Sequence, residues 1–218
     1  MTKKIPRRGL SKLYWLRPLI DIAMLILFIA IMHPRYTGMG THARMAYALC
    51  SIIVVHLLLN WRFFAAWGHG PWTRRRIILA VLDVSLLVSM VVCMVSVKLI
   101  PKHTGFYPSG LPNGFMQVHV VSGWLCMFLV AVHLGMHGTA LTGRLPKQGL
   151  MRKILNLVWK LAALAGVVGA VHINLWTRSQ GLYPLLKAPI LDPMGYYTAV
   201  VFILILISTV THYLVKQL

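Results

Sequence analysis

Four histidines in apolar segments share one spacing. His42 and His56 lie fourteen residues apart in one segment, and His119 and His133 lie fourteen residues apart in another. On an α-helix, fourteen residues advance ~21 Å and return to within roughly 40° of the same direction. Each segment can therefore present two imidazoles on one face, near opposite sides of a bilayer. Two such helices side by side would offer two bis-histidine sites, which is the ligand set that two stacked b-type haems need.

The elements that must carry these histidines are membrane-spanning helices. Hydrophobic residues make up 58% of the 218 residues, only 11% are charged, and the mean hydropathy is +0.74. This composition is typical of a polytopic membrane protein. The apolar stretches predict six transmembrane helices, over residues 15–32, 43–63, 77–100, 115–136, 154–176 and 196–215.

The expected fold class is therefore all-α, with six transmembrane helices. We expect a basic cytoplasmic N-terminus over residues 1–14 and a duplicated, two-hairpin diheme bundle of four helices over residues 15–140. Two additional transmembrane helices would follow over residues 141–218.

The basic residues are distributed unevenly about these spans. With six spans both termini lie on one side, and that side would hold sixteen of the 22 Lys and Arg residues. The positive-inside rule then predicts that both termini are cytoplasmic, in the inner membrane of a bacterium. Basic loops beside helix ends also favour anionic lipid head groups. The distribution of the net charge of +19 therefore argues against nucleic acid as a partner, and we expect none.

The first four spans read as a duplication. The first helix of each hairpin carries an aspartate near its cytoplasmic end, Asp21 and Asp83. The second helix of each hairpin carries the histidines, in His56-Leu-Leu-Leu-Asn60 and His133-Leu-Gly-Met-His137. The second and fourth spans are separated by one crossing, so they run in the same direction.

This topology places the histidines at two levels. The outer-level histidines are His42 and His119, and the inner-level histidines are His56 and His133. Because the spacing is equal, both levels are in register along the two helices, and we expect each level to hold one haem iron if the helices are adjacent.

Other residues of the repeat have candidate roles beside a haem. One turn after the outer-level histidine stands a small residue in each half, Ala46 or Gly123, which would let a flat macrocycle approach the backbone. Asn60 and His137 are candidates for a hydrogen bond to a haem propionate or a quinone carbonyl. His137 is also the substitute ligand to consider in place of His133.

The two hairpins resemble a bacterial membrane family with a repeated H-x13-H-L-x-x-N-W motif, here His42 through His56-Leu-Leu-Leu-Asn60-Trp61. That family is similar to the diheme cytochrome b subunits of respiratory hydrogenases and formate dehydrogenases. The resemblance covers roughly residues 15–140. It implies two haems b and electron transfer between the membrane quinone pool and a redox partner protein. The second repeat departs from the motif, since His137 stands where the first has Asn60.

Proton exchange with a quinone would need further polar groups. Asp21 and Asp83 are two of only three acidic residues in the chain, and a carboxylate within a membrane span is a functional hypothesis by default. The alternative is a local ion pair, such as Arg17 with Asp21 at i, i+4. His172, near Asn174 at the outer end of the fifth span, is a further quinone candidate. The inner level is favoured because its polar residues recur in both halves.

Two other functions stay open. A ferric-reductase-like transmembrane module would keep the haems, whereas a haem-free transporter or metal-binding membrane protein would use the histidines as proton relays or metal ligands. The chain contains no C-x-x-C-H, G-x-G-x-x-G or Walker A motif. We therefore expect an electron-transfer subunit that works with a separate redox partner protein or a multi-subunit oxidoreductase.

Overall fold

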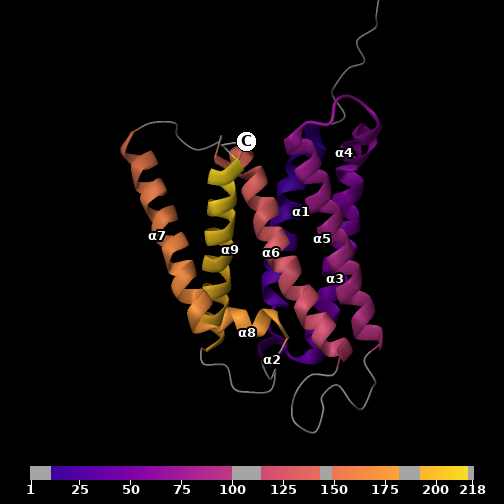
Figure 1. Cartoon of the computed structure of the whole chain (residues 1–218), viewed down its shortest axis with the longest axis vertical. Helices are drawn as coiled ribbons and strands as arrows, with labels where there is room; N and C mark the ends of the chain where they lie inside the picture. Colours follow the sequence, from indigo (N-terminus) through magenta and orange to yellow (C-terminus); the bar gives the residue numbers. More distant parts are fainter. Residues whose placement is uncertain (1–10, 100–113, 143–148, 182–191, 216–218) are drawn as a thin grey trace, which may run out of the picture. The chain divides into compact units, whose positions relative to one another are not determined.

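The computed structural model describes residues 11–99, 114–142, 149–181 and 192–215, and these segments contain helices and turns but no strand. The all-α prediction is therefore confirmed for this part of the chain (Figure 1). The long helices are α1 Ser11–Ala30, α3 Met39–Leu59, α5 Arg74–Leu99, α6 Gly114–Thr142, α7 Leu150–His172 and α9 Pro193–Val215. Short helices at their ends are α2 Pro34–Thr37, α4 Trp61–Ala65, η2 Ala66–Gly68 and α8 Leu175–Ser179.

Five of the long helices are long and apolar enough to cross a membrane: α3, α5, α6 over Gly114–Gly138, α7 and α9. They coincide with the second to sixth predicted spans, as expected of a multi-pass membrane protein. Helix α1 coincides with the first predicted span. It is not among the five helices above. The count of six spans stays a prediction.

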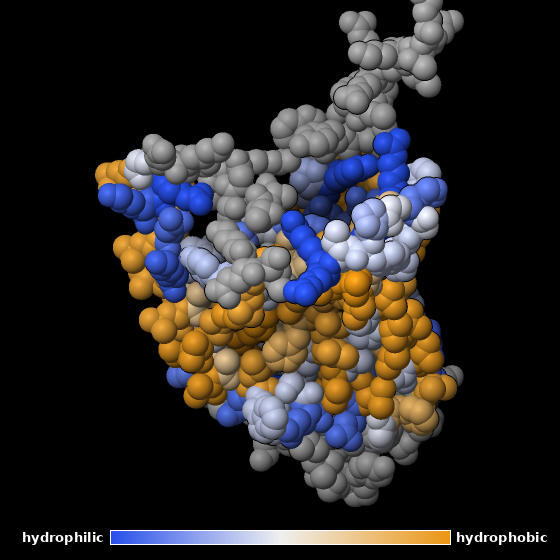
Figure 2. All heavy atoms as spheres, turned by 45° about the horizontal axis from the view of Figure 1, so that its top comes forward, coloured by the Kyte–Doolittle hydropathy of each residue, from blue (hydrophilic) through white to orange (hydrophobic). Residues whose placement is uncertain are grey.

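The exposed surface of these helices is apolar along their middle portions. Figure 2 shows hydrophobic side chains over the centres of the helices and hydrophilic ones toward their ends. On α7, for example, Leu157, Leu164 and Val171 are all exposed. An apolar surface of this extent is stable against lipid rather than water. The fold therefore agrees with the composition in indicating contact with membrane lipid.

The chain divides into two compact units, Met1–Pro71 and Trp72–Leu218. The division falls between the two histidine hairpins, so each unit contains one of them. In the first unit α1 packs antiparallel against α3, and in the second α5 packs antiparallel against α6. The four-helix bundle expected over residues 15–140 would draw helices from both units, and it stays a prediction.

Helix α9 is the centre of the second unit. It packs against both α6 and α7, and Tyr196, Val200 and Ile203 on its inner face are almost fully buried. Helix α8 contacts α6 and is anchored by Gln117, whose Nε2 donates to the carbonyl of Gln180 over 3.1 Å. The two helices that follow the repeat thus belong to the same packed unit as its second histidine hairpin.

Small residues allow the close approach of α9. A Cβ added at Gly135 of α6 would lie 2.6 Å from the carbonyl oxygen of Ser208, and one added at Gly166 of α7 would collide with the carbonyl oxygen of Phe202. The Ser208 hydroxyl donates to the carbonyl of Ala131 over 2.8 Å. Helix contacts of this kind are typical of membrane interiors, where van der Waals packing and interhelical hydrogen bonds replace the hydrophobic effect.

Gly135→Val should therefore destabilise the second unit. The added side chain meets main-chain atoms of α9, which cannot move aside cheaply, so we expect a loss of about 1–3 kcal/mol or more. The measurement is the midpoint of thermal unfolding of the purified protein in detergent, followed by circular dichroism. Gly114→Val on the same helix is the control, because a Cβ there meets nothing within 4 Å. Equal midpoints for the two variants would contradict the proposed packing.

Candidate functional site

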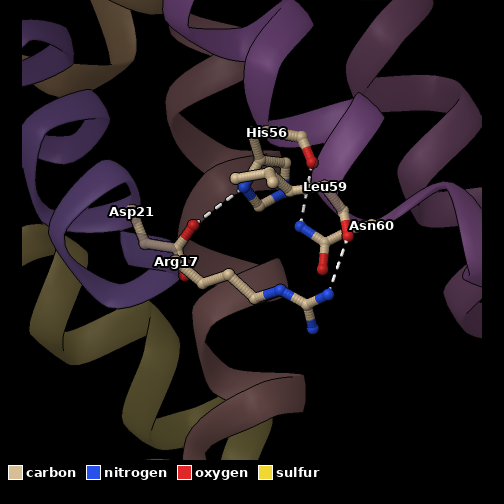
Figure 3. A network of polar contacts seen from close by, with 5 residues as sticks. All are labelled: Arg17, Asp21, His56, Leu59 and Asn60. Carbon is tan, nitrogen blue, oxygen red and sulfur yellow. Dashed lines mark hydrogen bonds and ion pairs between the residues drawn. The ribbon is translucent and has the colours of Figure 1, made fainter. Parts of the chain in front are cut away.

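In the first unit an aspartate on α1 meets the inner-level histidine on α3. The Nδ1 of His56 lies 2.8 Å from Oδ1 of Asp21 (Figure 3). A carboxylate has no proton to donate when ionised, so the imidazole Nδ1–H is the donor. The antiparallel packing of α1 and α3 places these two residues opposite each other although they are 35 residues apart.

The end of α3 next to this pair is also fixed by side chains. Arg17 Nη2 donates to the carbonyl of Leu59 over 2.9 Å, and Asn60 Nδ2 donates to the carbonyl of His56 over 2.9 Å (Figure 3). The last carbonyls of a helix lack the partner that a further turn would supply, and Arg17 supplies one for Leu59. The His56 carbonyl also accepts from the backbone N–H of Asn60 over 3.0 Å. The i, i+4 ion pair considered for Arg17 and Asp21 is not among the ion pairs of the described residues; each side chain reaches across to α3 instead.

The second unit repeats this arrangement. The Nδ1 of His133 on α6 lies 2.9 Å from Oδ1 of Asp83 on α5, and Arg75 Nη2 approaches the carbonyl of Met136 at 3.5 Å. In both hairpins the arginine thus reaches the residue three positions after the histidine. The Asp83 side chain is 16% exposed, whereas that of Asp21 is 52% exposed.

The predicted substitute ligand lies beside the inner-level histidine of this unit. The ring centroids of His137 and His133 are 4.6 Å apart, with the planes tilted by 45°. Asp83 accepts from His133. The structure therefore gives His133 the oriented ring that corresponds to His56 in the first unit.

The outer-level histidine of the second unit has a neutral partner. His119 Nδ1 donates to the carbonyl of Cys93 on α5 over 2.8 Å, and the Cys93 sulfur lies 3.4 Å from the same nitrogen. His42 in the first unit is half-buried near the start of α3. Cys50, Cys93 and Cys126 are all free thiols.

These contacts fix the tautomer of three of the four predicted ligands. His56, His119 and His133 each use Nδ1 as a donor to an oxygen atom. In a neutral imidazole the other nitrogen then carries the lone pair. Each ring is therefore oriented by its Nδ1–H, and its lone pair lies on Nε2.

A groove runs along α5 and α6 between the two histidine levels. Its volume is ≈ 330 Å³, and its lining residues are Val84, Ser85, Val88, Ser89, Val92, Ser122 and Leu125. The Ser89 hydroxyl donates to the carbonyl of Leu86, and the Ser122 hydroxyl donates to the carbonyl of Val118. With these hydroxyls bonded to main-chain oxygens, the groove presents a largely apolar lining.

The small residues of the repeat lie on the histidine helices. A Cβ added at Gly123 would meet only the Cys93 sulfur, at 3.9 Å, so the space beside it is open within the second unit. Ala46 is half-buried on α3. His172 is exposed at the last residue of α7, and Asn174 follows in the left-handed region with φ 52°. The structure thus brings the two aspartates to the inner-level histidines and leaves His172 apart from them.

Sequence reasoning missed the paired arginines and the Cys93 carbonyl. Arg17 precedes Asp21 by four residues, but Arg75 precedes Asp83 by eight, so aligning the two halves on their aspartates does not match the arginines. A main-chain acceptor such as the Cys93 carbonyl has no signature in the sequence. The recurrence of an arginine near the start of each first helix was the only available signal.

Among the residues that the structure describes, no three His, Cys, Asp or Glu side chains come together as a metal-binding group.

Asp83→Leu should destabilise the protein more than Asp21→Leu. Removing either carboxylate leaves an imidazole Nδ1–H without its acceptor, which costs about 1–3 kcal/mol where the group is buried. The two imidazoles are about equally exposed, at 26% for His56 and 29% for His133, but Asp83 is the less exposed carboxylate, so water can replace it less readily and its loss is the larger. Thermal unfolding midpoints of both variants test this, and Asp83→Asn should recover most of the loss because its Oδ1 still accepts. A larger effect of Asp21→Leu would contradict the difference in burial.

Comparison with protein-family models, with curated proteins and with solved structures finds no match to this chain. The functional assignment therefore rests on the residues themselves. It depends on two oriented Asp–His pairs and one oriented histidine in helices suited to a membrane.

Proposed function

We propose that this protein is an integral-membrane diheme b-type cytochrome that transfers electrons between the quinone pool and a redox partner protein. The observation that carries the proposal is the orientation of three of the four predicted ligands. Each donates its Nδ1–H to an oxygen atom of the neighbouring helix and leaves Nε2 as the coordinating nitrogen.

This orientation supports iron binding because metal-ligating histidines characteristically donate their other ring N–H to a carboxylate or a carbonyl. That hydrogen bond sets the tautomer and holds the ring in one rotation. An ionisable pair within a membrane is also costly to maintain. Finding it at corresponding places in two hairpins favours a shared function over two unrelated structural contacts.

The surroundings of the histidines suit a flat, apolar macrocycle. The space beside Gly123 is open, and the groove along α5 and α6 is lined largely by apolar groups. Four histidines provide two pairs of axial ligands, so the donor set fits two haems. Each expected pair, His42 with His119 and His56 with His133, takes one histidine from each unit.

In the proposed mechanism a bound haem would supply a one-electron carrier. The histidines would hold the two haems at levels about 21 Å apart along each helix. Asp21 and Asp83 keep the inner-level rings in one orientation, and the apolar side chains between the levels exclude water.

A haem-free transporter is the second candidate, because an Asp–His pair within a membrane is also the chemistry of a proton relay. An optical spectrum of the purified protein separates the two. Split b-type Soret and α-bands on reduction support the cytochrome. A ferric-reductase-like module would show the same bands, and reduction by a quinol distinguishes it from the quinone-linked function.

The proposal predicts two haems b per chain, measured by pyridine haemochrome assay. His42→Ala or His119→Ala should remove one haem, and His56→Ala or His133→Ala should remove the other. Cys93→Ala is the matched control, because the acceptor for His119 is the main-chain carbonyl and survives the change. A wild-type chain that holds one haem or none would refute the proposal.

We further propose that α1 crosses the membrane as a sixth span and that both termini face the cytoplasm of a bacterial cell. The charge distribution supports this orientation. A green fluorescent protein fused after Leu218 should therefore fluoresce, and an alkaline phosphatase fused there should be inactive. Phosphatase activity at this position would instead place the inner-level histidines toward the outside.

A further inference from the structure

The acidic residues of this chain are distributed unequally between the two histidine levels. The sequence contains three in total. Asp21 and Asp83 accept from the inner-level histidines, and Asp192 accepts from the backbone N–H of Gly195 over 2.9 Å at the start of α9. At the outer level His119 donates to the carbonyl of Cys93, which carries no charge.

We propose that the inner-level iron site has the lower reduction potential of the two. This inference rests on the proposed function. A carboxylate that accepts from an axial imidazole raises the basicity of that ligand and stabilises the more positive, oxidised iron. A carbonyl does this less, because a hydrogen bond to an ionised acceptor is roughly twice as strong as one between neutral groups.

The nearby arginines do not cancel this effect. Arg17 and Arg75 donate to the main-chain carbonyls of Leu59 and Met136, not to the carboxylates. Figure 3 shows the Arg17 guanidinium directed at the Leu59 carbonyl while Asp21 faces His56. The carboxylates therefore act on the ligands through a direct hydrogen bond. The guanidinium groups of Arg17 and Arg75 act on the iron site through space rather than through a hydrogen bond to its carboxylates.

This assignment changes the role expected for the two aspartates. They are positioning residues that act on the iron through the histidines, and a proton relay to a quinone is not needed to explain their place. Passage of one electron from the inner to the outer site, which oxidises the first and reduces the second, is then the favourable direction.

Redox titration of the full-length protein in lipid nanodiscs, followed at the α-bands, tests the order of the potentials. His119→Ala keeps the inner-level site, and His133→Ala keeps the outer-level site. We expect the inner-level site to titrate at the lower potential. Asp83→Asn added to His119→Ala should raise that potential by about 59 mV, which for one electron is a tenfold change in the equilibrium constant of reduction. Added to His133→Ala, the same change should leave the potential unmoved.

Asp192→Asn is the matched control, since it removes the same charge at the start of α9. The segment of α6 that carries His133 packs against the other end of α9, through Gly135. If the single-site proteins do not fold, a two-component titration of the wild type, Asp21→Asn and Asp83→Asn gives the answer: only the lower-potential component should move. Equal or reversed potentials, or an Asp83→Asn shift no larger than that of Asp192→Asn, would overturn the inference alone. A wild type without haem would overturn the proposed function as well.

Discussion

Hydrocarbon offers no hydrogen-bond partner, and this constraint determines how the histidine helices pack. A polar ring inside a span must find its acceptor on a neighbouring helix or remain unsatisfied at a cost of several kcal/mol. Asp21 meets His56, Asp83 meets His133, and the Cys93 carbonyl meets His119. The first bond joins α1 to α3, and the other two join α5 to α6, so these bonds fix the register of both antiparallel pairs.

Packing of small residues then holds the second hairpin in place. Gly135 lies two residues after His133 on α6, and it lets α9 approach within contact of the main chain. The Ser208 hydroxyl reaches the Ala131 carbonyl on the same stretch of α6. The segment that carries His133 is therefore held by α5 through a hydrogen bond and by α9 through close packing. In the proposed cytochrome such rigidity would keep the geometry of this ligand the same in both oxidation states.

The two halves of the duplication share chemistry but not surroundings. Both hairpins join an aspartate to a histidine, and both place an arginine on the carbonyl three residues beyond that histidine. In the second unit α6 also packs against α8 and α9, and α7 packs against α9. Asp83 in this unit is less exposed than Asp21 in the first. The same substitution at equivalent positions of the two repeats should therefore change the stability by different amounts.

The sequence by itself determined the features that depend on neighbours along the chain. Hydropathy located the helices, because about 20 consecutive apolar residues suffice to define a span. The fourteen-residue spacing placed two imidazoles on one face of each histidine helix, because helical periodicity is a local property. The repeated aspartates were also evident, although their role as local ion pairs or proton carriers was left open.

Only the tertiary structure decided which atoms meet across the helices. Asp21 and His56 are 35 residues apart, and Asp83 and His133 are 50 apart. Because these separations differ, the sequence did not indicate that the two pairs form the same bond. The acceptor of His119 is a main-chain oxygen, which every residue has and which therefore cannot be predicted from residue types. The choice of Nδ1 as the donor, and hence of Nε2 as the nitrogen with the lone pair, follows from these contacts. The antiparallel packing of two helices determines these contacts, and the spacing of residues along one helix does not.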